Sequence, residues 1–119
     1  MKFEIPGKLP GLNEVVAAAK RHFGSYSSDK KRYTELVSLY ARKMPQYGKI
    51  NITITWIEKN EKRDKDNISG GGTKFILDGL VLARVILNDT WKYIGNITHR
   101  YEVDKQNPRI EVELEEVAE

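Results

Sequence analysis

The sequence has no cysteine, only two histidines and no long apolar run. The lack of cysteine excludes disulfides, thiolate zinc sites and a cysteine nucleophile. His22 and His99 are too few for a histidine metal cage, and we expect His99, in a strand-like stretch, to be a packed or surface residue. Because no run approaches the roughly 18–20 apolar residues of a membrane span and no signal-peptide pattern opens the chain, we expect a soluble, cytoplasmic protein.

The composition predicts a single folded domain over residues 1–119, since 39% of the residues are hydrophobic and the chain is long enough for a core. The net charge of +3 is unevenly distributed. Residues 1–65 contain 14 Lys/Arg against 7 Asp/Glu, and residues 66–119 contain 6 against 10. Such asymmetry is typical of a basic face that meets a polyanion, although solvated surface charge explains it equally well.

Hydrophobic spacing predicts the elements of the first half. Residues 2–5 and 50–57 alternate as strands do, and the second of these strands places Ile50, Ile52, Ile54 and Trp56 on one face. Residues 12–23 have helical spacing ended by Gly24, and a polar linker over 25–29 leads to an amphipathic helix ended by Pro45. The apolar stripe of this second helix contains Tyr33, Leu36, Val37, Tyr40, Ala41 and Met44.

The second half is predicted in the same way. Ser69–Gly72 is expected to be a flexible turn, and Thr73 is expected to cap an apolar helix over 73–83. A strand over 91–103, a turn over 104–108 and a last strand over 110–114 follow. The order β-α-α-β-α-β-β predicts an α/β (α+β) fold in which helices cover one face of a mixed sheet.

Carboxylates gather around one charged stretch. Asp64 and Asp66 follow the strand over 50–57 and are two residues apart, so an extended backbone would point both side chains the same way. Asp89 follows the predicted helix, although Asn-Asp is also a common turn pair. Oxygen ligands of this kind suit Mg²⁺, and with the basic flank they indicate a metal-dependent enzyme that cuts a nucleic-acid backbone.

Three known functional motifs, a calcium-binding loop, a phosphate-binding loop and a serine-hydrolase motif, are excluded for this sequence. Ile68, Ser69 and Phe75 stand where a calcium EF-hand loop needs a ligand, a glycine and a glutamate. Gly70–Lys74 lacks the spacing of a phosphate-binding loop. No Gly-x-Ser-x-Gly motif occurs, so a serine hydrolase is unsupported.

Lys74 and Asp78 form an i, i+4 pair on the apolar helix. Charged residues on such a helix are uncommon unless they are paired or functional. Lys74 is therefore a candidate for a phosphate contact, with a plain ion pair as the alternative. Asp78 could orient Lys74 or bind metal.

The motifs together resemble those of the RusA family of Holliday-junction resolvases. The resemblance rests on Arg63-Asp64-x-Asp66-Asn67, Lys74-x-x-x-Asp78-x-Leu80 and Asn88-Asp89, and on Pro10-x-x-Asn13 near the start. Two features depart from the family pattern. Ser69–Gly72 lengthens the spacer before Lys74, and Asn88 replaces the first aspartate of a pair that some members have.

The resemblance implies a homodimer that binds a four-way DNA junction and nicks two strands symmetrically in a bacterial or phage-infected cell. It assigns Asp64, Asp66 and Asp89 to Mg²⁺, for which Mn²⁺ would substitute, and makes Lys74 the essential lysine. Asp78, Asn67 and Asn13 are candidate supporting residues. The alternatives are a non-catalytic protein that binds branched DNA and a nuclease that acts on flaps or RNA.

Six basic residues are candidates for phosphate contacts. Lys30, Lys31 and Arg32 are expected in the first turn of their helix, where cations oppose the helix dipole, a mild sign that they face an anion. An exposed basic turn without a role explains them equally well. The complete set is Lys30, Lys31, Arg32, Lys62, Arg63 and Lys65.

Overall fold

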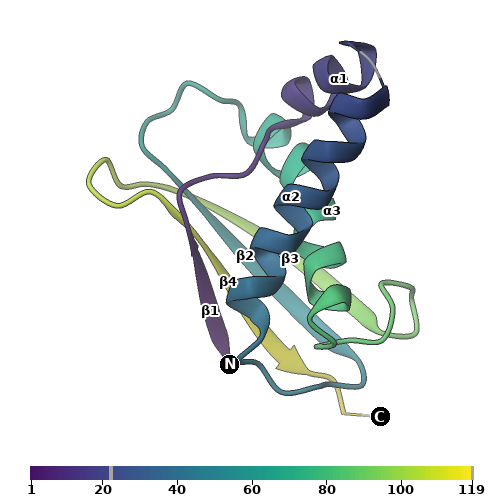
Figure 1. Ribbon diagram of the computed structural model, residues 1–119. Coiled ribbons are helices and arrows are strands. Elements are labelled where there is room, and N and C mark those ends of the chain that lie inside the picture. The colour runs from purple at the N-terminus through teal and green to yellow at the C-terminus, as the bar shows by residue number, and fades with distance from the viewer. Residues whose placement is uncertain (22, 119) are drawn as a thin grey trace.

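The predicted order of elements is confirmed by the computed structural model, which describes residues 1–21 and 23–118 (Figure 1). His22 lies outside the described residues. The elements are β1 (Lys2–Pro6), α1 (Leu12–Arg21), α2 (Phe23–Ala41), β2 (Ile50–Glu58), α3 (Lys65–Leu82), β3 (Ile94–Val103) and β4 (Arg109–Glu116). No helix in the described part of the chain combines the length and apolar character needed to cross a bilayer.

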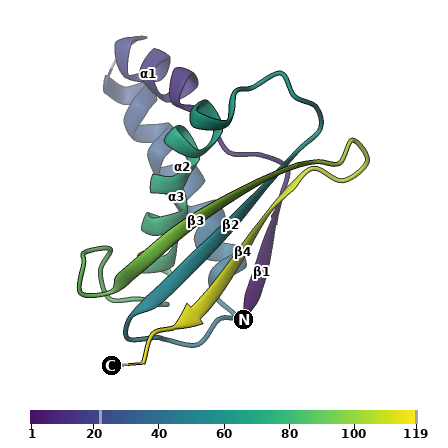
Figure 2. The same ribbon diagram turned by 180° about the vertical axis from the view of Figure 1, so that it is seen from behind.

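The four strands form one mixed sheet in the order β1-β4-β2-β3. β4 pairs antiparallel with both β1 and β2, whereas β2 and β3 are parallel. α3 connects the two parallel strands, as a parallel pair requires a crossover. The helices cover one face of the sheet, as predicted, and the other face is open (Figures 1 and 2).

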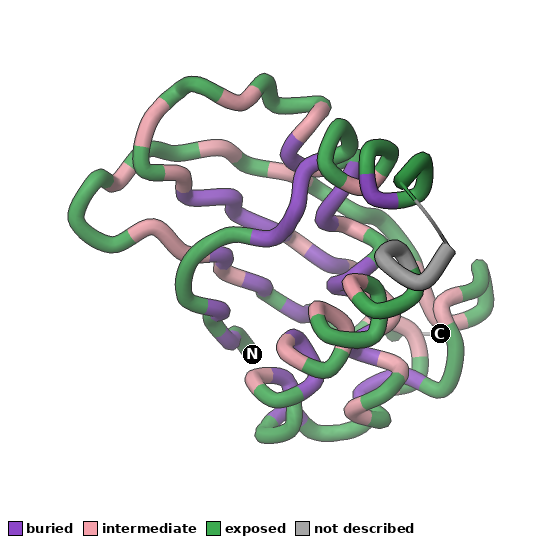
Figure 3. Tube along the Cα trace, turned by 45° about the horizontal axis from the view of Figure 1, so that its top comes forward, coloured by how far each residue is buried: buried purple, intermediate pink, exposed green. Residues whose placement is uncertain are grey.

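The core lies between the sheet and the helices (Figure 3). Alternation in β2 turns Ile50, Ile52, Ile54 and Trp56 inward, each at most 1% exposed. The predicted stripe of α2 packs against them, with Val37 and Ala41 fully buried. Burial of each large apolar side chain contributes about 1.5–3 kcal/mol, so this layer holds the helices on the sheet.

The boundary between the first two helices was predicted wrongly. α1 ends at Arg21 and α2 begins at Phe23, so Gly24 does not end a helix and residues 25–29 are helical. Within α1, Ala18 is the buried residue, whereas Leu12 and Val16 are more than 40% exposed. α1 packs against α2 and α3.

α3 begins at Lys65, so Ser69–Gly72 is helix rather than a flexible turn and Thr73 is not its cap. A Cβ on Gly71 would lie 2.2 Å from the carbonyl carbon of Gly11, and one on Gly72 would lie 2.6 Å from the Trp56 ring. Only glycine permits such close packing, which outweighs its low helix propensity of about 1 kcal/mol per residue. Thr73 Oγ1 instead donates to the Ser69 carbonyl, at 2.6 Å.

The prediction for the third strand was wrong at its start. β3 begins at Ile94, and Trp91 lies in a preceding turn, where it is 93% exposed. Ile97 and Val103, apolar residues of this strand, are 37% and 53% exposed. β3 lies at the edge of the sheet, where a strand is less enclosed than a central one, so its alternation does not lead to burial.

Candidate functional site

Asp64 and Asp66 lie at the start of α3, after the loop that leaves β2. Asp64 is the N-cap residue and makes no side-chain capping bond, while Asp66 is in the first turn. The predicted extended arrangement is therefore wrong, because the helix begins between them. A carboxylate here is favoured by the positive end of the helix dipole.

Both carboxylates nevertheless line one pocket of about 870 Å³, the β2–α3 pocket. Sequence reasoning missed most of its other lining residues, because β2, α3 and β3 meet there only in the folded sheet. Trp56 and Tyr101 are partners in the β2–β3 register. The sequence indicated them only as positions on strands, not as lining residues of a pocket. The remaining lining residues include Glu58, Asn60, Glu61, Ile68, Glu102 and Val103.

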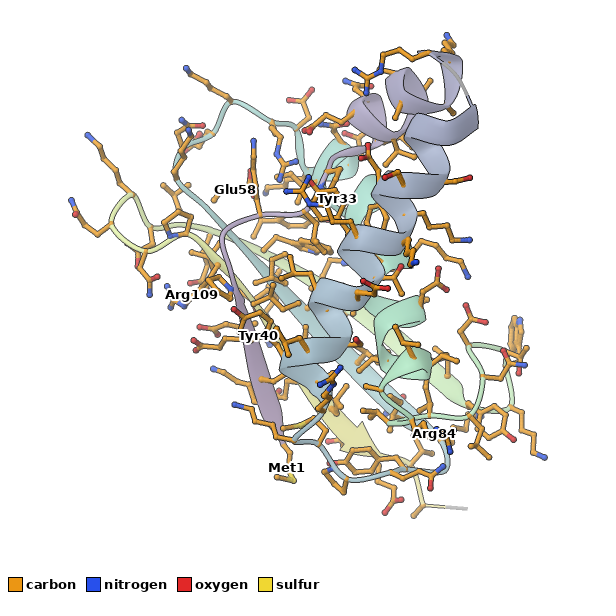
Figure 4. The ribbon with its side chains drawn as sticks, in the orientation of Figure 1. Met1, Tyr33, Tyr40, Glu58, Arg84 and Arg109 are labelled. Carbon is orange, nitrogen blue, oxygen red and sulfur yellow. The ribbon has the colours of Figure 1, made fainter. Side chains whose placement is uncertain are left out.

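Arg63 also lines the pocket, but its guanidinium binds protein groups. Nε and Nη2 each donate to a carboxylate oxygen of Glu58 at 2.9 Å, and Nη1 donates to the Leu9 carbonyl at 3.0 Å. Nη1 lies 3.4 Å from Glu14 Oε1 as well. Arg63 and Glu58 are only 14% and 12% exposed. Arg63, the residue before Asp64, is thus held by Glu58 and the Leu9 carbonyl, and Figure 4 shows Glu58 at this end of the sheet.

Asn67 and Asn13, the predicted supporting residues, contact each other. Asn67 Oδ1 accepts a hydrogen bond from the backbone N–H of Asn13 at 2.8 Å. This N–H belongs to the first turn of α1, where the backbone donors have no partner within the helix. Asn67 therefore ties the start of α1 to the start of α3, next to Asp66.

Lys74, Asp78 and Asp89 form a second group, the Lys74 cluster. Lys74 Nζ lies 2.6 Å from Asp89 Oδ2 and 3.1 Å from Asp78 Oδ1. The hydrogen bond between Lys74 and Asp89 raises the pKa of the lysine and lowers that of the carboxyl group. The Lys74 side chain is 60% exposed, and its ammonium is paired with both carboxylates.

The predicted triad of Asp64, Asp66 and Asp89 is not gathered at one point. Lys74 is eight positions after Asp66 in the helix, about 12 Å farther along the axis. The β2–α3 pocket is lined by neither Lys74 nor Asp89. Among the described residues, no group of three or more acidic or histidine side chains is arranged to hold a metal ion.

The donor set at the pocket still suits Mg²⁺. This ion commonly uses only one or two protein carboxylates and completes its shell with water and substrate phosphate. Within residues 1–21 and 23–118, neither Asp64 nor Asp66 forms a salt bridge, whereas Asp89 is neutralised by Lys74. A cation is therefore better accommodated at Asp64 and Asp66 than at Asp89.

The other predicted basic residues are exposed. Lys30, Lys31 and Arg32 lie in the third turn of α2, so the argument from the first turn of a helix does not apply to them. Lys62 and Lys65 flank Asp64, and Lys65 Nζ is 5.5 Å from the Tyr101 ring centroid. Figures 1 and 2 show α1, the start of α2, the start of α3 and the loop after β2 at one end of the molecule.

The comparisons with known proteins add no assignment. No protein-family model matches the chain, and no curated protein matches it significantly.

Proposed function

We propose that this protein is a Mg²⁺-dependent, structure-selective DNA endonuclease that resolves Holliday junctions, like the RusA family that its motifs resemble. The observation that carries the proposal is a pair of carboxylates, Asp64 and Asp66, in a pocket at the start of α3, neither of which forms a salt bridge with a described residue. The exposed basic residues at the same end of the molecule support a polyanionic substrate. Such an enzyme would act in the cytoplasm of a bacterial or phage-infected cell.

The roles of the residues follow from their surroundings. Asp64 and Asp66 would hold Mg²⁺, which when bound activates water and stabilises charge on a phosphodiester. Lys74 would contact a phosphate oxygen with its exposed ammonium, and Asp78 and Asp89 would orient that ammonium. We thus assign Asp89 to positioning Lys74, although the resemblance assigns it to the metal. Arg63 positions the loop that carries Asp64.

The proposal includes a homodimer, because two symmetrical nicks in a two-fold junction require two sites related by a similar symmetry. Sedimentation of the purified protein tests this point separately. A dimer at the concentrations that give cleavage agrees with the proposal. A monomer that makes paired nicks would contradict this part of it.

The decisive experiment compares a labelled four-way junction with a linear duplex of the same sequence, in Mg²⁺ or EDTA. The variants are Asp66→Asn and, as a matched control on the open face of the sheet, Glu113→Gln. We expect paired symmetrical nicks in the junction alone, lost in EDTA and in Asp66→Asn but kept in Glu113→Gln. Lys74→Ala should lower cleavage about 100-fold while affinity changes much less.

The alternatives have distinct outcomes in the same assay. Tight junction binding without a nick in Mg²⁺ or Mn²⁺ would identify a non-catalytic protein that binds branched DNA. Faster cleavage of a flap or an RNA than of the junction would identify a nuclease of different selectivity. Normal turnover by Asp66→Asn would remove Asp66 from the mechanism.

A further inference from the structure

The turn before β3 presents a tryptophan almost entirely to solvent. Trp91 is 93% exposed, whereas the other tryptophan, Trp56, is 1% exposed and packs in the core. Burial of an aromatic ring is among the larger stabilising contributions that a side chain can make. Trp91 makes no such contribution to this fold, so its presence there needs another explanation than packing.

The backbone around Trp91 is held in place on both sides. The N–H groups of Tyr93 and Ile94 donate to the Thr90 carbonyl at 2.9 and 3.0 Å, which closes a turn around the tryptophan. The carbonyl of Tyr93 accepts from the N–H of Ile50, at the start of β2. An indole on a fixed turn loses little conformational entropy when it binds a flat partner.

Cations occur close to Trp91 along the chain, together with the two carboxylates of the Lys74 cluster. Asp89, two residues earlier, pairs with Lys74, whose side chain is 60% exposed, and the exposed Lys92 follows Trp91 directly. Arg84, at the start of the same loop, is exposed as well (Figure 4). A protein partner seated on the indole would have to cover these cations, whereas a nucleic acid would meet them with phosphates.

We propose that Trp91 is a stacking residue that receives an unpaired or unstacked base of the DNA next to the Lys74 cluster. This inference rests on the proposed function and adds a specificity determinant to it. A base has a flat π face in every sequence context, and stacking on an aromatic side chain is a common means of binding it. A continuous duplex keeps its bases stacked, but a branch point exposes bases, so Trp91 would favour branched DNA.

The test measures binding in EDTA, where no strand is cut, by the anisotropy of a labelled junction and a labelled linear duplex. Trp91→Ala should weaken junction binding about tenfold and duplex binding much less. Trp91→Phe, which keeps a ring, should bind within about threefold of wild type. Leu87→Ala is the matched control, because Leu87 is a 61% exposed apolar residue of the same loop.

Tryptophan fluorescence supplies a second readout. The junction should quench the emission of the wild-type protein, and Trp91→Phe, which retains only the buried Trp56, should show no such quenching. Junction binding with unchanged emission and unchanged affinity in Trp91→Ala would overturn the inference and leave the proposed function intact. Absence of any junction binding by wild type would overturn the proposed function itself. A change of oligomeric state in Trp91→Ala would instead make the residue a contact between copies.

Discussion

At the residue scale, charge alone does not reveal which basic residues are available to a substrate. Arg63 was a candidate for DNA binding, yet three of its nitrogens are held by Glu58 and the Leu9 carbonyl. Lys62, the preceding residue, is exposed. The planar guanidinium matches a carboxylate with two parallel bonds, which a lysine cannot do. The two neighbours therefore have different roles despite equal charge.

Arg63→Ala should lower the free energy of unfolding by about 3 kcal/mol, because it leaves the mostly buried Glu58 carboxylate without its partner. Lys62→Gln, the control, should change it by less than about 0.5 kcal/mol. Urea denaturation followed by circular dichroism measures both. Equal stability of the two variants would show that the Arg63 contacts do not hold the loop.

At the element scale, α3 connects the two parts of the candidate site. It begins beside Asp64 and Asp66 and carries Lys74 and Asp78 farther along. Its glycines allow it to lie against the backbone of residues 10–12 and the ring of Trp56. The helix therefore depends on close contact at these glycines, not on its own propensity.

Gly71→Ala should destabilise the protein by about 1–3 kcal/mol, since the added methyl would overlap backbone atoms of Gly11 and Leu12. Gly70→Ala is the matched control, because its methyl would meet only Leu12 at an ordinary 3.5 Å. This control should be neutral or more stable by up to about 1 kcal/mol. Thermal unfolding of both variants decides the matter, and a Gly71→Ala protein as stable as Gly70→Ala would contradict the packing.

The sheet contains a contact that should respond to pH. Trp56 Nε1 donates to His99 Nδ1 at 3.0 Å, so Nδ1 carries no proton, and burial lowers the pKa of this histidine from 6.5. The unfolded state therefore binds more protons than the folded state. The stability that neutral His99 contributes is present above pH 6.5 and is lost as the pH falls through the lower pKa of the folded state.

Replacement of the histidine tests this dependence. His99→Gln keeps an acceptor for Trp56 but cannot titrate. The difference in unfolding free energy between wild type and His99→Gln should therefore change between pH 7 and 5, with wild type losing more. A constant difference over this range would show that His99 has the same pKa in both states.

At the scale of the whole molecule, the charges are arranged by face. The exposed lysines and arginines of α1, of the first half of α2 and of the loop after β2 lie at the end that carries the β2–α3 pocket (Figures 1 and 2), whereas Arg84 and Lys92 lie in the loop before β3. The open face of the sheet contains a row of carboxylates from β4, partly paired with cations, as Lys2 and Arg109 each lie 3.0 Å from Glu111. Figure 4 shows Arg109 on the sheet side of the molecule. A polyanion would be attracted to the basic end of the molecule and repelled by the carboxylates on the open face of the sheet.

Combined replacement of Lys30, Lys31 and Arg32 by glutamine should weaken DNA binding and reduce its salt dependence. The slope of log affinity against log salt should decrease by up to about 3 if each contacts one phosphate. Removal of two carboxylates from β4, with Glu113→Gln and Glu115→Gln, should leave that slope unchanged. Equal effects of the two replacements would show that total charge, not its location, determines binding.

Most of the fold could be predicted from local patterns. The alternation in β2 and the stripe of α2 identified their buried faces, because burial on one side imposes the period of the element on the sequence. The run Ser69–Gly72 was misinterpreted, since glycine indicates a turn unless a close neighbour requires it in a helix. Trp91 was assigned to a strand by its spacing, although it lies in an exposed turn.

The sequence by itself determined the order of the elements, the inward faces of the main strands and the residue types that could bind a cation and a phosphate. These properties depend on neighbours within a few positions, so local sequence patterns are sufficient to predict them. Only the tertiary structure decided that Arg63 is held by Glu58 and that the glycine run within α3 is helical. It also decided that Asp89 pairs with Lys74 and does not join Asp64 and Asp66. Each of these depends on segments distant in the chain, whose contacts are set by packing the helices on the sheet.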